Sequence, residues 1–218
     1  MLIDRLRLMM GAGVFLAFLG PDGVGKSTVI AEVERQVAPA FRRQARFHLR
    51  PNFGKQQGAS VTVNNPHSKP PRGFLGSMAK LGLWWADYVA GYFLSVYPKL
   101  IRSTLVMFDR YADDLAVDPK RYRFGGPLWM ARFLGRIVPR PDLTFVLVAD
   151  PEIIQARKAE VPLAETSRQV KEYQNLAQRK GVIVVEAGRP VEEVVQDIVN
   201  EIMKWMEKRT HKRLGLQS

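Results

Sequence analysis

Residues 20–28 of the chain read GPDGVGKST and fit the phosphate-binding pattern G-x-x-x-x-G-K-[ST]. The glycines let successive backbone N–H groups approach phosphate oxygens, and a helix that follows adds its positive N-terminal end. Lys26 can then reach the β- and γ-phosphates of ATP, and the Ser27 hydroxyl can ligate Mg²⁺. The stretch therefore predicts a site for ATP and Mg²⁺ formed by Gly20, Asp22, Gly23, Val24, Gly25, Lys26, Ser27 and Thr28.

A second group of candidates follows the apolar run in LVMFDRY, where Asp109 and Arg110 come directly after residues 105–108. An aspartate at the end of a central strand can hold a metal-bound water or orient an acceptor hydroxyl, and an adjacent arginine can bind phosphate. The alternative is a capping aspartate with a surface arginine. We predict that Ser27 and Asp109 serve the metal, and that Lys26, Asp109 and Arg110 are catalytic.

Asp22 is an acid inside a loop built for a negative ligand. Facing the polyphosphate, its carboxylate would be an electrostatic cost. We therefore expect its side chain to turn away, toward hydroxyl or amine donors on the acceptor side of the cleft.

The elements that position these residues are visible as apolar runs separated by helical patterns. The runs lie at residues 13–19, 45–49, 104–108, 143–149 and 182–186. Continuous apolar runs are typical of strands covered on both faces, as in a parallel sheet. Helices are predicted for residues 26–37, 76–102, 127–138, 151–158, 166–180 and 190–208. This alternation predicts an α/β fold, a doubly wound sandwich of the P-loop NTPase type with a five-stranded parallel sheet flanked by helices.

Length and composition favour one domain, because 218 residues with 46% apolar content can bury one sizeable core. Within the single domain 1–218 we predict an acceptor-side loop at 51–76, a lid at 157–168 and a basic tail at 209–218. The glycines and prolines of 51–76 make that stretch too broken for an ordinary connection.

The net charge of +12 indicates either a solvated basic surface or an anionic partner. Nucleic acid is disfavoured as that partner, because no helix-turn-helix, zinc-finger or RNA-recognition signature is present. The chain has no cysteine, which fits a reducing compartment, and we predict a cytoplasmic protein. Residues 82–98 are apolar but short, and Asp87 stands in their middle, so a buried or amphipathic helix is favoured over a membrane span.

Together, GPDGVGKST and FDRY resemble the thymidylate kinases, a branch of the nucleoside monophosphate kinase family. The similarity extends to DLTFVLVADPE, to ARK and to VIVVEAGRPVEEVVQDI. The resemblance implies a kinase that moves a phosphoryl group from ATP to the phosphate of a deoxynucleotide. It also implies that Asp22 contacts the acceptor's sugar, that Asp109 and Arg110 serve the acceptor, and that Arg157 is a catalytic lid arginine stabilising transferred charge.

The acceptor region departs from the family pattern. Thymidylate kinases carry Arg-Glu-Pro-Gly-Gly after the second strand, whereas this chain has HLRPNFG, in which Arg50 stands in for part of the motif. The predicted acceptor-binding set is Asp22, Arg50, Asp109 and Arg110. The stretch FDRYADDLAVDPKRYRFGGP further resembles thymidylate-kinase-like proteins associated with surface polysaccharides.

Several alternatives therefore stay open at this point. The acceptor is a nucleoside monophosphate or, alternatively, a glycan or glycolipid of the cell envelope, and a non-catalytic nucleotide-binding protein is the third reading. The predicted partners are a small molecule with a phosphate or hydroxyl group, a weakly bound anionic membrane surface and a second copy in a homodimer. The aromatic residues Trp84, Trp85, Tyr88, Tyr92 and Phe93 either line an acceptor pocket or belong to the core.

Overall fold

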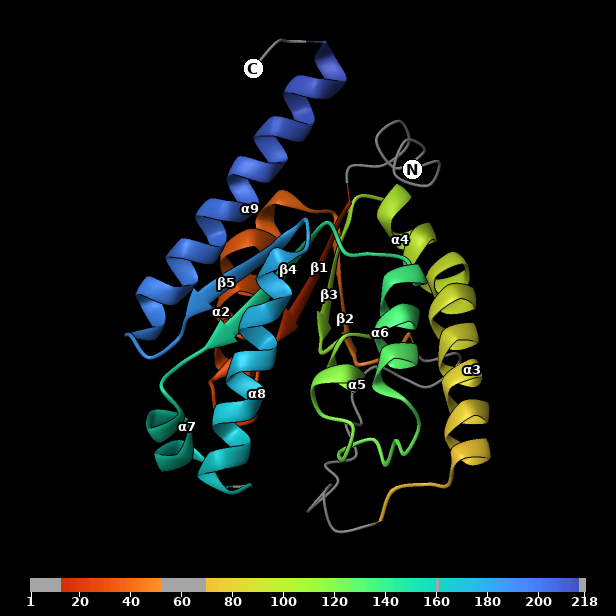
Figure 1. The fold of residues 1–218 in the computed structure, drawn as a ribbon. Coiled ribbons are helices and arrows are strands. Elements are labelled where there is room, and N and C mark those ends of the chain that lie inside the picture. Colours follow the sequence, from red (N-terminus) through yellow and green to blue (C-terminus); the bar gives the residue numbers. More distant parts are fainter. Residues whose placement is uncertain (1–12, 52–69, 160, 216–218) are drawn as a thin grey trace.

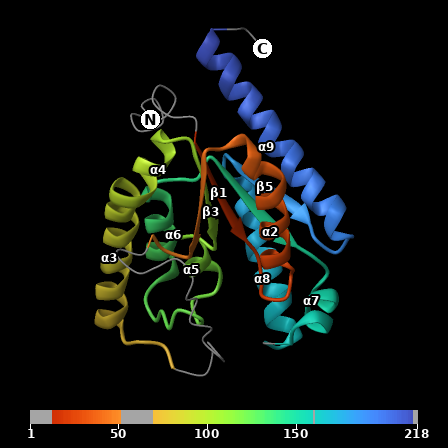
Figure 2. The same ribbon diagram turned by 180° about the vertical axis from the view of Figure 1, so that it is seen from behind.

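In a computed structural model, which describes residues 13–51, 70–159 and 161–215, five parallel strands form one sheet in the order β2-β3-β1-β4-β5. They are β1 (Val14–Leu19), β2 (Arg43–His48), β3 (Thr104–Asp109), β4 (Leu143–Val148) and β5 (Val182–Glu186). Helices flank the sheet on both faces (Figures 1 and 2). The predicted fold class is confirmed.

The central strand β1 pairs in parallel with β3 on one side and β4 on the other. Every residue of β1 and β4 is buried, as continuous apolar runs between two helical layers must be. Phe18 of β1 lies opposite Asp109 of β3, so the phosphate-binding loop and the Asp109–Arg110 pair leave the sheet at the same edge. Parallel pairing therefore brings the two sequence motifs together.

Two helices, α2 (Lys26–Val37) and α9 (Val191–Leu214), pack together on one face of the sheet, and α6 (Leu128–Ile137) and α8 (Leu163–Asn175) cover the other (Figures 1 and 2). Helix α2 has the predicted bounds, and its apolar stripe is buried: Val29, Ile30, Val33 and Val37. The short helix α7 (Pro151–Arg157) begins after Asp150, whose carboxylate accepts the Glu152 N–H at 2.9 Å. As predicted, this helix has a proline in its first turn. Proline is tolerated there because a backbone N–H at that position would have no partner within the helix.

The helix predicted for 76–102 is interrupted. Helix α3 (Phe74–Gly91) continues into a π-helical turn (Tyr92–Val96) and then α4 (Tyr97–Ile101). The Tyr97 N–H reaches back five residues to the Tyr92 carbonyl. Pro98, which follows, has no N–H to continue the ordinary pattern, so the helix widens one turn before it.

Helices extend into three of the predicted segments. Residues 74–76 of the predicted loop 51–76 belong to α3, and residues 52–69 lie outside the described part of the chain. Residues 163–168 of the predicted lid already belong to α8. Residues 209–214 of the predicted tail continue α9, which therefore ends later than predicted. Basic residues favour the last turn of a helix, and Gly215, with φ 69°, provides the left-handed cap that ends it.

The helix predicted for 166–180 ends as an α-helix at Asn175 and continues as the 3₁₀ turn Leu176–Gln178. The sequence analysis missed two short helical segments, α5 (Asp114–Val117) and the 3₁₀ turn Ala38–Ala40. Each is too short to show a helical apolar period. The interpretation of 1–218 as a single domain stays a prediction.

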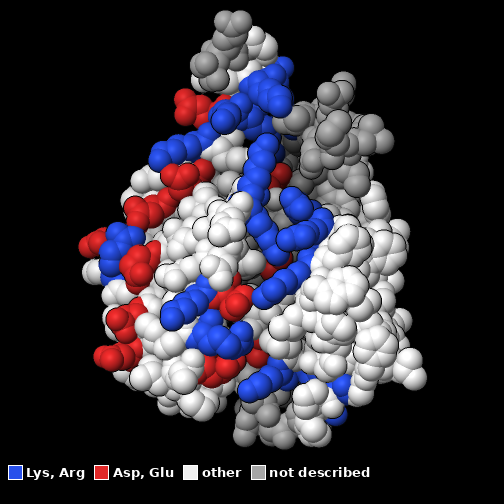
Figure 3. Space-filling model, viewed as in Figure 1, with Lys and Arg blue, Asp and Glu red and all other residues white. Residues whose placement is uncertain are grey.

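Helices α3 and α6 expose several large apolar side chains, and the right side of Figure 3 is a region largely without charged residues. Trp129, Phe133 and Ile137 of α6 are at least 46% exposed and lie at helical spacing on one face. Leu83 and Trp85 of α3 are also exposed, whereas Trp84, Tyr88 and Tyr92 are buried in the core. Among the described residues, no helix is both long and apolar enough to cross a membrane.

Candidate active site

The phosphate-binding loop connects the end of β1 to the first turn of α2. Gly20, Gly23 and Gly25 all have positive φ, and Gly25 is the left-handed N-cap of α2. Within the described part of the chain, no side chain caps this helix. Its first N–H groups therefore point into the loop, where they can donate to phosphate oxygens. Ser27 and Thr28 are exposed at the same helix end.

Gly20 has the least room of these glycines. Its φ is 146°, and a Cβ placed on it would lie 2.4 Å from the Leu147 carbonyl oxygen of β4. We expect Gly20→Ala to destabilise the protein by at least about 2 kcal/mol and to weaken ATP binding, because the loop must shift. Urea unfolding and ATP titration measure both effects.

Gly82→Ala provides the matched control, because Gly82 is an exposed residue inside α3, and a Cβ placed on it would meet no atom within 4 Å among the described residues. We expect this change to be neutral or to stabilise the helix by up to about 1 kcal/mol. Equal unfolding free energies for the two variants would contradict the assigned constraint at Gly20.

Lys26 is buried, with 7% of its surface exposed. Its Nζ donates to the carbonyls of Gly20 and Pro21, each at 2.7 Å, and lies 3.9 Å from Asp22 Oδ1. Burial, with a smaller effect of the nearby Arg110 charge, lowers the pKa of Lys26 to about 8, against the opposing effect of Asp22 and Asp109. The loop thus holds a cation whose charge is incompletely balanced, beside the predicted phosphate position.

Asp109 ends β3 beside β1, and its Oδ1 is buried without a hydrogen-bond partner in the described part of the chain. Its Oδ2 lies 3.7 Å from His48 Nδ1. Burial alone would raise the pKa of Asp109, but the nearby His48 and the charge of Lys26 outweigh it and lower the pKa below its ordinary value. Asp109 is therefore an ionised acid beside the loop, and its buried Oδ1 has no hydrogen-bond partner among the described residues.

Both the backbone and the side chain of Arg110 are held by hydrogen bonds. Its N–H donates to Phe18 O at 2.9 Å, and its backbone adopts φ 71°, an uncommon conformation for a residue other than glycine. Its guanidinium, 5% exposed, donates to Asp114 Oδ2 at 2.6 Å and to Asp22 Oδ1. Burial would lower the pKa of Arg110, but Asp114 and the other nearby acids raise it above its ordinary value. The arginine is a fixed cation.

Asp114, in α5, was missed by the sequence analysis and is completely buried. Besides Arg110 it accepts hydrogen bonds from Tyr122 Oη at 2.5 Å and from Tyr173 Oη of α8. Burial tends to raise the pKa of Asp114, but Arg110 and the two tyrosine hydrogen bonds lower it. The only local signal was the four-residue spacing from Arg110 to Asp114.

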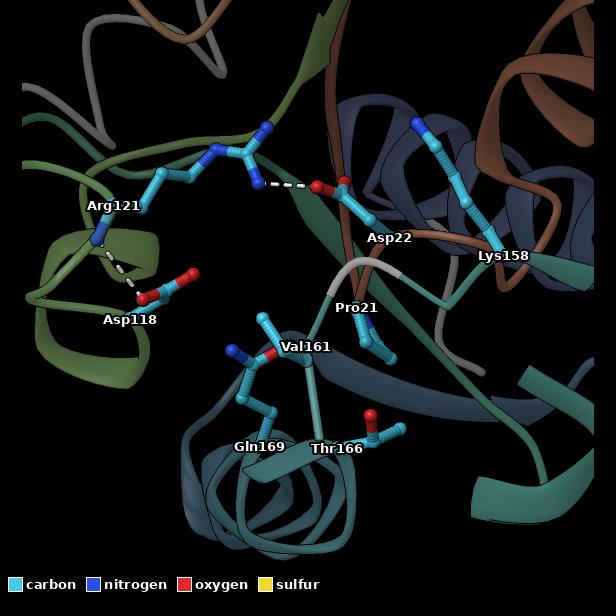
Figure 4. A pocket seen from close by; sticks show the side chains of 8 residues that line it. All are labelled: Pro21, Asp22, Asp118, Arg121, Lys158, Val161, Thr166 and Gln169. Carbon is cyan, nitrogen blue, oxygen red and sulfur yellow. Dashed lines mark hydrogen bonds and ion pairs between the residues drawn. The ribbon is translucent and has the colours of Figure 1, made fainter. Parts of the chain in front are cut away.

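The Asp22 carboxylate contacts two guanidinium groups. Its Oδ1 pairs with Arg110, and its Oδ2 pairs with Arg121, which comes from the connection between α5 and α6. Figure 4 shows the Arg121 guanidinium directed at the Asp22 carboxylate. Both lie on a small pocket that is lined by Pro21, Asp22, Asp118, Arg121, Lys158, Val161, Thr166 and Gln169. The sequence analysis missed Arg121 as well.

Two predicted site residues lie at the margins of this cluster. Arg157, the last residue of α7, has Nη1 3.5 Å from Val24 O of the phosphate-binding loop and 3.4 Å from Ala187 O. Arg50 follows β2, pairs with Asp87 Oδ2 at 2.6 Å and lies over the Trp84 ring. The acid within the apolar helix thus has its cationic partner, and the acceptor role of Arg50 stays a prediction.

Magnesium fits the oxygen donors of this site. No cluster of three or more His, Cys, Asp or Glu side chains suited to a metal occurs in the described ranges. Mg²⁺ needs no such cluster, because it keeps several waters and takes substrate phosphates with one or two protein oxygens. The exposed Ser27 hydroxyl and the buried Asp109 Oδ1, which has no hydrogen-bond partner among the described residues, are oxygen ligands of that kind.

Comparisons with known proteins identify relatives of the chain. A family model described as thymidylate kinase matches residues 18–198. A probable thymidylate kinase of Pyrobaculum calidifontis is 31% identical over 201 residues, which are 88% of this chain and 97% of that protein. A thymidylate kinase of Leifsonia xyli is 31% identical over 208 residues, with 85% and 92% covered. The family model covers most of the chain, and both relatives are 31% identical over most of their length. The chain therefore belongs to the thymidylate kinase family of enzymes.

Proposed function

We propose that the chain transfers the γ-phosphoryl group of ATP to the phosphate of a nucleoside monophosphate, with thymidylate as the first candidate. The observation that carries the proposal is the convergence of Lys26, Asp109, Arg110 and Asp22 at one end of β1 and β3. Two cations and two acids meet there beside a helix N-terminus open to phosphate. Family membership and the names of the relatives support the nucleotide acceptor.

On the ATP side, the loop amides and Lys26 would hold the β- and γ-phosphates. Lys26 would exchange its two backbone carbonyls for phosphate oxygens, which relieves the incomplete balance of its charge. Ser27 and Asp109 would hold Mg²⁺, which when bound neutralises charge on the phosphates. Arg157, which contacts the loop at Val24 O, would stabilise transferred charge. Catalysis would then rest on positioning and charge neutralisation.

On the acceptor side, Arg110 would bind the acceptor phosphate and Asp22 a sugar hydroxyl, with Arg50 at the rim of the site. Asp114 fixes the Arg110 guanidinium, so little conformational freedom is lost when phosphate binds. Asp109 would serve both the ATP side and the acceptor side of the site, and would orient the acceptor. The resemblance to the thymidylate kinases supports these roles.

An ADP-release assay over a panel of acceptors tests the proposal. We expect thymidylate, or another nucleoside monophosphate, to be used at least about tenfold better than sugar phosphates, measured as kcat/KM. Turnover of an envelope glycan or a sugar phosphate without turnover of any nucleotide would contradict the nucleotide acceptor. ATP binding without transfer to any acceptor would contradict phosphotransfer itself.

A second copy of the chain and an anionic membrane surface stay predicted partners. The exposed apolar side chains of α3 and α6 are compatible with a second copy of the chain. The high positive charge is compatible with an anionic membrane surface.

A further inference from the structure

One carboxylate, that of Asp22, receives guanidinium groups from two different elements. Arg110 comes from the end of β3 and donates to Oδ1, and Arg121 comes from the α5–α6 connection and donates to Oδ2. Two converging arginines form the arrangement that proteins use to bind phosphate. In this structure the anion between them belongs to the protein itself.

The two arginines are held very differently. Arg110 is 5% exposed and fixed by Asp114. Arg121 is 22% exposed and lines the pocket beside the loop. Within the described ranges, the Arg121 side chain uses only Nη1, toward Asp22, so the donors on Nε and Nη2 stay available. Arg121 can therefore change its partner while Arg110 stays in place.

We propose that Arg121 is an acceptor-binding residue that selects phosphomonoesters, by exchanging its ion pair with Asp22 for one with the phosphate of the acceptor. The inference rests on the proposed function and names the group that the acceptor must carry. A neutral hydroxyl bound to Arg121 could not compensate for the lost ion pair with Asp22, whereas a doubly charged phosphate can. After the exchange, Asp22 keeps Arg110 as its partner and frees Oδ2 for an acceptor hydroxyl.

The test compares Arg121→Ala and Arg121→Lys with Arg123→Ala. Arg123 is the matched control, because it lies two residues away and its side chain donates to Pro70 O outside the cluster. We expect Arg121→Ala to raise KM for thymidylate about ten- to a hundredfold, with KM for ATP and the melting temperature nearly unchanged. Arg121→Lys should restore part of the affinity, and Arg123→Ala should behave as the wild type.

Calorimetry with thymidylate, thymidine and inorganic phosphate separates selection from a structural role. Wild-type protein should prefer thymidylate to thymidine, and Arg121→Ala should lose that preference by the same factor as the rise in KM. Asp22→Asn should bind inorganic phosphate about tenfold more tightly, because the competing carboxylate charge is gone. Equal losses for thymidylate and thymidine in Arg121→Ala would overturn the proposal, as would wild-type protein that binds neither thymidylate nor phosphate.

The two hypotheses can fail separately. If wild-type protein binds thymidylate but transfers no phosphoryl group to it, the proposed function is wrong, and the ratio of thymidylate to thymidine affinity still decides the role of Arg121. If turnover is normal and that ratio is unchanged in Arg121→Ala, the role of Arg121 is wrong and the proposed function stands.

Discussion

Replacing Lys26 with alanine should lower the rate of phosphoryl transfer by about a hundred- to a thousandfold, the range found when one fixed electrostatic contact to the transition state is removed. The ammonium is buried and sits among the loop carbonyls, so it can follow the phosphates with little rearrangement. No other lysine occupies the loop. The measurement is initial-rate ADP formation with saturating ATP and acceptor.

A matched control is Lys204→Ala, since Lys204 lies on α9 and pairs with Glu201 at 2.7 Å on the surface. That change should leave the rate within about twofold of the wild type, because exposed ion pairs contribute little. Melting temperatures of both variants exclude loss of fold as the cause of any loss of rate. Transfer by Lys26→Ala at the wild-type rate would contradict both the assigned role and the proposed function.

The pH dependence of ATP binding carries a signature of the same residue. Because the pKa of Lys26 is lowered to about 8 in the ligand-free protein, the side chain loses its charge as the pH rises through that value. The charged form binds polyphosphate better, so the ATP affinity of the wild type should fall above about pH 8. In Lys26→Ala this part of the pH dependence should disappear, which calorimetry from about pH 7 to about pH 9.5 would measure.

The strands and the loop could be predicted because their signals are local. Continuous apolar runs mark β1 and β4, and the glycine-lysine-serine spacing places the loop between a strand and a helix. The acid-arginine pair at 109 and 110 could likewise be read from the residues around it. Parallel pairing of β1 with β3 then joins the two motifs, a consequence of fold class rather than of any single residue.

Contacts between distant charges could not be predicted in this way. Asp22 and Arg121 are 99 residues apart, and Asp114 and Tyr173 are 59 apart, so no local pattern links them. In a chain with 33 basic residues, composition also gives no reason to single out Arg121. For Asp22, the sequence could suggest which way the side chain points, because a carboxylate is repelled by phosphate. Which residues it pairs with could be learned only from the folded structure.

Asp114→Asn should destabilise the folded protein by about 3–5 kcal/mol, the range for removing one partner of a buried ion pair. The carboxylate is completely buried and joins Arg110 to Tyr122 and Tyr173, and thereby joins β3 to α8. An amide cannot balance the guanidinium, and its NH₂ group would face a hydroxyl or guanidinium donor. Arg110 would keep Asp22 as its remaining acidic partner.

The effect should be measured as the free energy of unfolding in urea, beside Asp197→Asn. Asp197 pairs with Arg189 at 2.5 Å but is 53% exposed, so we expect a loss below about 1 kcal/mol there. The pKa of Asp114 in the folded protein lies below 3.8, the ordinary value of an aspartate. Its contribution to stability is therefore fully present above that value and is lost as the pH falls through the lower folded pKa. Asp114→Asn should lack this acid-dependent component, and similar unfolding free energies for the two variants would show that the buried network does not hold α8 against β3.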